Sequence, residues 1–146
     1  MRFRLMLDPN AEEEVTATVH ERSSFTDELE GLVARHGGTD RLVGYADDER
    51  RLLHFEEVAC VFVEAGKTYA VTREGKRFLL RQRLYEVEAV LPGGFLRINK
   101  SAVGNVSCME RFTVSLSGAV DVIFQGGYRD YVSRRCFADI KRRVLK

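Results

Sequence analysis

The segment Phe95-Leu96-Arg97-Ile98-Asn99-Lys100-Ser101-Ala102-Val103-Gly104-Asn105 does most to decide how this chain folds. It begins like a β-strand, passes through the polar group Asn99-Lys100-Ser101, and becomes apolar again over residues 102–105, where a short turn is expected. A second basic group, Tyr131-Val132-Ser133-Arg134-Arg135, ends the last strand-like run and opens a C-terminal helix. Amide and guanidinium groups at strand ends are suited to contact base edges and phosphates. Two such groups on a β-rich scaffold favour DNA over a small substrate.

Length and composition indicate a soluble protein of one domain, or of one domain with a small appendage. The chain has 146 residues, of which 45% are hydrophobic and 31% are charged. No apolar run approaches the ~20 residues that a membrane helix needs, and the apolar start before Asp8-Pro9 is too short for a signal peptide. The three cysteines, Cys60, Cys108 and Cys136, are scattered and form no C-x-x-C pair. They indicate a reducing cytoplasm, without a zinc site or a disulfide framework.

The net charge of +1 conceals an uneven distribution. Residues 1–57 contain seven Arg and fourteen Asp or Glu, a net charge of −7, whereas residues 58–146 contain sixteen Lys or Arg and eight Asp or Glu, a net charge of +8. A basic region attracts polyanions such as nucleic acid, and an acidic region repels them. A merely solvated basic surface is the simpler explanation, but it accounts poorly for this asymmetry.

Residues 1–44 are expected to form a small acidic unit of strand, strand and helix. Two stretches alternate, residues 2–7 and 14–20, and the Asp8-Pro9-Asn10 segment between them has turn chemistry. A helix with one apolar stripe follows and is expected to end at Gly37-Gly38, a typical left-handed C-terminal cap. A strand at residues 41–46 is expected to close the unit, in which we find no catalytic constellation.

Residues 45–146 are expected to form a second unit that is mostly β. A helix is predicted over residues 83–91, where Pro92 stops it, and Ser133 is expected to cap a C-terminal helix. Apolar alternation bounded by turn residues predicts the remaining strands. These strands are expected at residues 58–64, 68–72, 76–80, 108–116, 119–125 and 128–132.

No motif in the chain supports an enzyme. Gly66-Lys67-Thr68 is similar to the end of a phosphate-binding loop, but Val61 occupies the position of the required first glycine, and a strand rather than a helix follows. The histidines have no spacing that suits a metal or a triad, and neither a serine elbow nor a pair of carboxylates can be defended. We therefore expect no cofactor, no metal and no small-molecule substrate.

The charged and amide residues of the polar groups have different expected roles. Arg97 can form an ion pair with an acid of residues 86–88, and Asn105 can satisfy a local turn, so neither needs a ligand. For Lys100 and Arg135, contact with DNA is favoured. Arginine can bind guanine in a bidentate manner, and lysine supplies salt-sensitive attraction to phosphates.

Four blocks of this sequence, in the same order and spacing, closely resemble the LytTR-type DNA-binding domain over residues 45–146. The blocks are Val63-Glu64-Ala65-Gly66-Lys67-Thr68-Tyr69-Ala70, Arg83-Leu84-Tyr85-Glu86-Val87-Glu88, Phe95-Leu96-Arg97-Ile98-Asn99-Lys100-Ser101 and Val132-Ser133-Arg134-Arg135. The resemblance implies a mainly β fold with α, an elongated arrangement of antiparallel sheets rather than a helix-turn-helix. It implies that loops at sheet ends enter successive major grooves.

The resemblance also implies which residues bind DNA and with what partners. The contact positions of the family fall on Lys67, Thr68, Asn99, Lys100 and Arg135, and Arg134 belongs to the same block. About 45 residues precede the match, too few for a receiver domain, so the chain is similar to stand-alone regulators. Such regulators bind repeated promoter sites as at least a homodimer on DNA, and some are held in check by a membrane protein.

Three other functions stay open at this level. The acidic N-terminal unit could make the protein an interaction module, or could dock on the basic part and mask it. An RNA binder is disfavoured because Phe62, Tyr69, Phe95 and Phe112 have the spacing of buried strand positions rather than of a stacking platform. An enzyme is the least favoured, since nothing in the sequence supports it.

Overall fold

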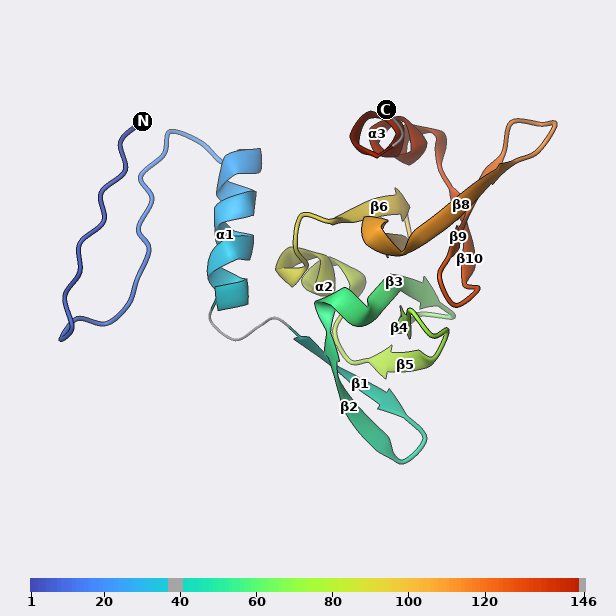
Figure 1. Ribbon diagram of the computed structural model, residues 1–146, viewed down its shortest axis with the longest axis horizontal. Helices are drawn as coiled ribbons and strands as arrows, with labels where there is room; N and C mark the ends of the chain where they lie inside the picture. The colour runs from blue at the N-terminus through green and yellow to red at the C-terminus, as the bar shows by residue number, and fades with distance from the viewer. Residues whose placement is uncertain (37–40, 145–146) are drawn as a thin grey trace.

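The computed structural model describes residues 1–36 and 41–144, which form two antiparallel sheets and three α-helices (Figure 1). The helices are α1 (Ser24–His36), α2 (Leu84–Val90) and α3 (Arg134–Arg143). The strands are β1 (Arg41–Ala46), β2 (Glu49–His54), β3 (Val58–Glu64), β4 (Lys67–Thr72), β5 (Arg77–Leu80), β6 (Phe95–Asn99), β7 (Ala102–Asn105), β8 (Met109–Val114), β9 (Val120–Phe124) and β10 (Arg129–Val132). The fold is therefore mainly β with α, as predicted.

The larger sheet has seven strands in the order β2-β1-β5-β4-β3-β7-β6. Strand β3, the fifth in this order, pairs with β4 on one side and with β7 on the other: Val61 lies opposite Ala70 and also opposite Val103. Alternate side chains of these strands enter a core that α2 covers with Val87 and Leu91. This sheet is the rigid base on which the loops at its ends are held.

The smaller sheet has the order β10-β9-β8 and shares a second core with α3 and the far side of β3, β6 and β7. Phe124 of β9 and Ile140 of α3 are both fully buried in this core. Gly104 of β7 makes the close approach possible, because a Cβ atom at this position would lie 2.7 Å from the Phe124 ring. The two sheets thus form one packed body.

The structure confirms most of the predicted elements of residues 45–146. The helix α2 ends before Pro92, and Ser133 caps α3 by accepting a hydrogen bond from the Cys136 amide at 3.2 Å. The six predicted strands are present with boundary shifts of one or two residues. The strand at residues 41–46 is also present, but it pairs with β2 and β5 of the larger sheet rather than with the N-terminal segments.

Other predictions were wrong. Residues 2–7 and 14–20 form no strand: they run as an exposed, extended segment beside α1 (Figure 1). Residues 102–105 form the buried strand β7 and not a short turn, and the sequence did not indicate β2. The Gly37-Gly38 cap lies outside the described residues. Within the described part of the chain, no helix is long and apolar enough to cross a bilayer.

Candidate nucleic-acid interface

The first candidate contact loop is the hairpin between β3 and β4. Its tip, Ala65 and Gly66, has the left-handed φ values of 51° and 77°, which turn the chain so that Lys67 begins β4 with its side chain exposed. The next residue, Thr68, is only 7% exposed. Lys67 is therefore available to a ligand at this tip, and Thr68 is largely covered.

The second candidate loop joins β6 to β7, and Asn99 holds its shape. Asn99 is 2% exposed, and its amide nitrogen donates to the Asp130 carboxylate at 3.2 Å and to the Tyr131 carbonyl at 2.8 Å. Its Oδ1 atom accepts from the Ser101 amide at 2.8 Å. All this hydrogen bonding is internal, so Asn99 fixes the turn and Lys100 projects from it, exposed to solvent.

The third candidate segment is the first turn of α3. Arg134 and Arg135 are its first two residues, and both are exposed. The cap residue Ser133 donates its amide to the carbonyl of Ile98 at 2.8 Å, which ties the start of α3 to the end of β6. The guanidinium groups thus emerge beside the turn that carries Lys100.

Backbone hydrogen bonds bring the three segments together at one end of the molecule. The Val63 amide, at the end of β3, donates to the Ser101 carbonyl at 2.8 Å, as Ser133 does to Ile98. We call this region, defined by Lys67, Lys100, Arg134 and Arg135, the cationic end. Within the described part of the chain, none of these four side chains takes part in an ion pair or a hydrogen bond. Figure 1 places the ends of β3 and β6 on the side of the molecule opposite the N-terminal segment.

A network of partly buried hydrogen bonds holds the cationic end in place. One Asp130 oxygen accepts from Asn99 and from the Tyr131 amide, and the other accepts from the Tyr128 hydroxyl at 2.8 Å. Burial raises the pKa of Tyr128 strongly, and the nearby Cys60 and Asp130 add to the shift. The Tyr128 ring stacks on Phe62 with the ring centroids 4.6 Å apart. The network thus connects β3, β6 and β10, the strands that lead to the three loops.

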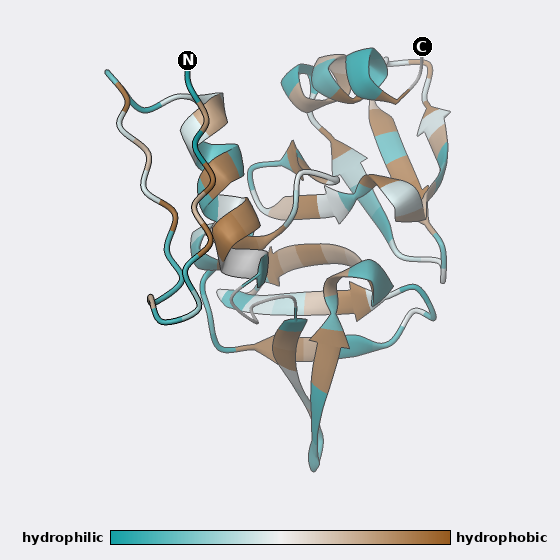
Figure 2. Ribbon diagram, turned by 60° about the vertical axis from the view of Figure 1, so that its left-hand side comes forward, coloured by the Kyte–Doolittle hydropathy of each residue, from teal (hydrophilic) through white to brown (hydrophobic). Residues whose placement is uncertain are grey.

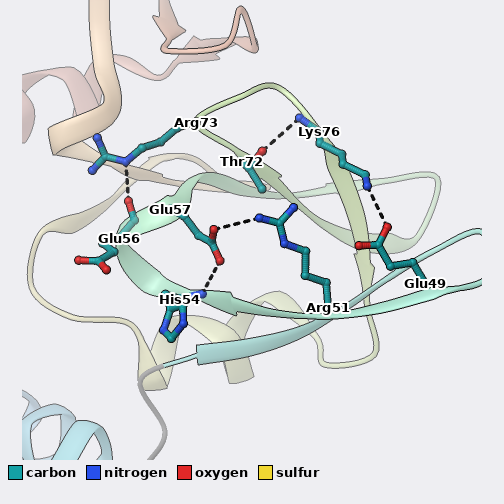
Figure 3. Close-up of polar contacts among 8 residues, drawn as sticks. All are labelled: Glu49, Arg51, His54, Glu56, Glu57, Thr72, Arg73 and Lys76. Carbon is teal, nitrogen blue, oxygen red and sulfur yellow. Dashed lines mark hydrogen bonds and ion pairs between the residues drawn. The ribbon is translucent and has the colours of Figure 1, made fainter.

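Other cations of the basic region are used within the protein. Lys76 forms an ion pair with Glu49 at 2.9 Å, which lowers the pKa of Glu49, and Arg73 donates to the carbonyl of Glu56 at 2.5 Å (Figure 3). These contacts join β2 and the short helical turn after it, which hold Glu49 and Glu56, to the turn between β4 and β5. Part of the uneven charge distribution is therefore satisfied inside the fold.

Two predicted local roles are confirmed. Arg97 forms an ion pair with Glu88 at 2.7 Å and also donates to the Lys100 carbonyl at 2.7 Å, so it braces the turn. Asn105 is 5% exposed and accepts from the Ser107 amide at 3.1 Å. Neither residue is available to a ligand through these groups.

The structure thus separates the six predicted contact residues into two sets. The exposed ones, Lys67, Lys100, Arg134 and Arg135, come together at the cationic end, whereas the low exposure of Thr68 and Asn99 leaves little of either side chain for a base. Sequence reasoning missed Asp130, and only its position two residues after Tyr128, on the same face of a polar strand, could have drawn attention to it.

A β-scaffold that presents free cations from three adjoining loops defines a class of protein that binds polyanions. The model of the LytTr DNA-binding domain family matches residues 48–144. The chain therefore belongs to the LytTr family of DNA-binding proteins.

Two relatives are similar to this chain along its length, and one solved structure has a similar fold. An uncharacterized HTH-type transcriptional regulator of Staphylococcus aureus (strain bovine RF122) is 31% identical, and the alignment covers 99% of this chain and 98% of that protein. A regulator with the same description in strain NCTC 8325 is 28% identical over the same shares. The LytTr DNA-binding domain of a protein described as a methyl-accepting/DNA response regulator from Bacillus cereus has a TM-score of 0.63 at 20% identity, covering 70% of this chain and 94% of that one.

These findings confirm the predicted class, a DNA-binding transcription regulator and not an enzyme. The fold nevertheless differs from the helix-turn-helix that the names of these relatives mention. In the described residues, five strands separate α1 from α2 and another five separate α2 from α3. The helix-turn-helix needs two consecutive helices joined by a short turn, so this chain must bind DNA in another way.

Proposed function

We propose that this protein is a sequence-specific transcription regulator whose cationic end enters successive major grooves of duplex DNA. The observation that carries the proposal is the convergence of four free cations, from three loops, at one end of a rigid pair of sheets. Recognition of two grooves on one side of the duplex requires contacts about one helical turn apart, roughly 34 Å, which two loops or two copies can span.

The four cations are assigned different contacts with DNA because a guanidinium and an ammonium bind differently. Arg135 is assigned to a base edge, because a guanidinium can donate two hydrogen bonds to one guanine. Lys67, Lys100 and Arg134 are assigned mainly to phosphates, where the charge gives salt-sensitive affinity. Thr68 and Asn99 are positioning residues in this proposal, since their burial suits them to hold the loops rather than to touch DNA.

The proposal includes the wider setting that the resemblance implies. Two copies bind repeated half-sites in a promoter, in the cytoplasm, and a membrane protein restrains the regulator. These features rest on similarity to stand-alone regulators. The binding of two copies to one site requires an interface between them.

The test is selection of bound duplexes from a random library, with the full chain and Arg135→Ala in parallel. The full chain should enrich a repeated short motif, and Arg135→Ala should reduce discrimination at one base position by roughly 5- to 150-fold, the equivalent of about 1–3 kcal/mol. Arg129→Ala is the matched control, because Arg129 pairs with Asp121 at 2.9 Å at the other end of β10.

The outcomes separate recognition from simple attraction. Binding without enrichment would mean that the cationic end is a nonspecific basic surface. An equal loss of affinity by Arg135→Ala on selected and on random DNA would remove Arg135 from its assigned role. Reduced discrimination by Arg129→Ala would mean that the base contacts lie elsewhere.

A further inference from the structure

The N-terminal arm, residues 1–20, has the pattern of two strands but no partner for either. Phe3, Leu5 and Leu7 are 88%, 70% and 88% exposed, and Val15 and Val19 are 62% and 43% exposed. The described backbone hydrogen bonds of the arm lie at the turn, where the Ala11 amide donates to the Asp8 carbonyl at 3.2 Å. Figure 2 shows hydrophobic and hydrophilic positions alternating along both legs of the arm.

An amphipathic segment in this state is suited to pair with another chain. Extended backbone with unpaired N–H and C=O groups is a template for strand addition. Exposed apolar side chains gathered on one segment are a common mark of an interaction site. The helix that follows extends the surface, because Phe25, Leu32 and Val33 of α1 are 42%, 56% and 42% exposed.

The sequence of the second leg is complementary to itself. When residues 14–20 pair antiparallel with the same residues of another copy around Ala17, Val15 lies opposite the partner's Val19 on the apolar face. On the polar face Thr16 lies opposite the partner's Thr18, and Glu14 opposite the partner's His20. Apolar, Thr–Thr and hydrogen-bonding polar pairs of this kind stabilise antiparallel strands.

The charged residues on either side of residues 14–20 limit the pairing to these seven residues. In the same register Glu13 would lie opposite the partner's Glu21, and like charges directly opposite one another are destabilising. The pairing therefore ends at seven residues. The unit 1–36 is also long enough for a stable association, since a standard interface uses roughly 20–30 residues on each side.

We propose that residues 14–20 pair with the same residues of a second copy, so that the arm and α1 form a homodimerisation unit. The two-fold axis passes beside Ala17, and the apolar faces of the arms are covered by the exposed side of α1 from both copies. The unit lies on the side of the molecule away from the cationic end, so two copies can be joined without covering it (Figure 1). As an account of how two copies reach one promoter site, the inference rests on the proposed function.

Disulfide cross-linking of the full chain tests the register. In a Cys136→Ser background, which removes the partly exposed thiol and leaves the buried Cys60 and Cys108, Ala17→Cys should give a covalent dimer under mild oxidation. Residues directly opposite one another have Cα atoms about 4.5–5.5 Å apart, within disulfide reach. Thr16→Cys and Thr18→Cys are the matched controls. Each alone faces a diagonal neighbour at roughly 7–8 Å and should cross-link poorly, and a mixture of the two should cross-link well.

Sedimentation of the unmodified chain without DNA provides the second measurement. A dimer at micromolar concentration, which Val15→Asp converts to monomer, is expected. A monomer, a Val15→Asp protein that stays dimeric, or Thr16→Cys alone cross-linking as fast as Ala17→Cys would each overturn the inference. A monomer that still enriches a DNA motif overturns only the dimer, whereas a dimer that enriches none overturns only the proposed function.

Discussion

The N-terminal arm and the β3–β4 hairpin both have sequences typical of strands, but only the hairpin is paired in a sheet. Phe3 in the arm is 88% exposed, whereas Phe62 in β3 is 3% exposed. The difference is the partner: β3 lies between β4 and β7 in the sheet, and neither leg of the arm pairs with a strand in the part of the chain that the structure describes. An alternating pattern thus defines an amphipathic segment, but it does not define the segment on which that face is buried.

The charged side chains also differ in whether they have a partner within the chain. Lys76 and Arg97 have partners inside the chain and hold the fold together, whereas the side chains of Lys100 and Arg135 form no ion pair or hydrogen bond in the described residues and belong to the proposed DNA contact. Groups that the fold satisfies act in stability, and groups that it leaves free are available for binding. The predictions below test this division.

The largest difference in stability should be between substitutions of the two phenylalanines, Phe62 in β3 and Phe3 in the arm. Phe62→Ala removes a ring that stacks on Tyr128 and Tyr69 with centroids 4.6 and 5.6 Å away, so it should lower the free energy of unfolding by about 3–5 kcal/mol. Phe3→Ala should change the unfolding of the sheets by no more than about 0.5 kcal/mol. Denaturant unfolding, followed by the circular dichroism of both variants, gives the two values.

This pair of variants can contradict the difference drawn between the arm and the sheet. If Phe3→Ala costs as much as Phe62→Ala, the arm is packed on the sheets in solution, and the difference between the two regions disappears. If Phe3→Ala reduces only the association of two copies, the difference becomes sharper, since the arm then contributes to assembly and not to the fold.

Much of the fold could be predicted from the sequence because local signals agree with the packing. Pro92 and Ser133 fix the end of α2 and the start of α3, and the Gly75 turn fixes the β4–β5 hairpin. The strand β7 was missed because its four residues, Ala102–Asn105, are short and follow a polar turn, and only the neighbours β3 and β6 make them a strand.

The site could be predicted only in part. Spacing and residue type indicated Lys100 and Arg135, which the fold leaves exposed. They could not indicate that Asn99 is turned inward, because its partners Asp130 and Tyr131 are about thirty residues away in sequence. Burial of a polar residue depends on long-range hydrogen bonds, which a local pattern does not contain.

A smaller effect is expected at two aspartates of the second sheet. Asp130→Ala removes one of the two acceptors of the Asn99 amide and the acceptor of the partly buried Tyr128 hydroxyl, which should cost about 1–3 kcal/mol of stability and weaken specific DNA binding. Asp121→Ala breaks only the exposed ion pair with Arg129, which should cost at most about 1 kcal/mol. Unfolding curves and binding titrations on selected DNA measure both variants.

The binding data show whether Asp130 positions the contact loop. Asp130→Ala should weaken binding to selected DNA more than to random DNA, because a displaced Lys100 turn loses register but keeps its charge. Equal weakening on both, with the stability unchanged, would mean that the Asn99 turn holds its shape without Asp130, and the distinction between satisfied and free groups would fail at this point.

The smallest effect on DNA binding should come from substitutions of single lysines. The test compares a free cation, Lys141, with a paired one, Lys76. Lys141 lies two helical turns after Arg134 on α3, with its ammonium 5.0 Å from the Phe137 ring centre and no acid beside it in the described residues, so it can face phosphates. Lys141→Ala should reduce the slope of log affinity against log salt concentration by about one, the loss of one phosphate contact, with little change in site preference. Lys76→Ala should leave the slope unchanged, because the Lys76 ammonium is already paired with Glu49. Titrations at several salt concentrations measure both slopes, and an equal reduction by Lys76→Ala would mean that an internal ion pair does not withdraw a cation from DNA.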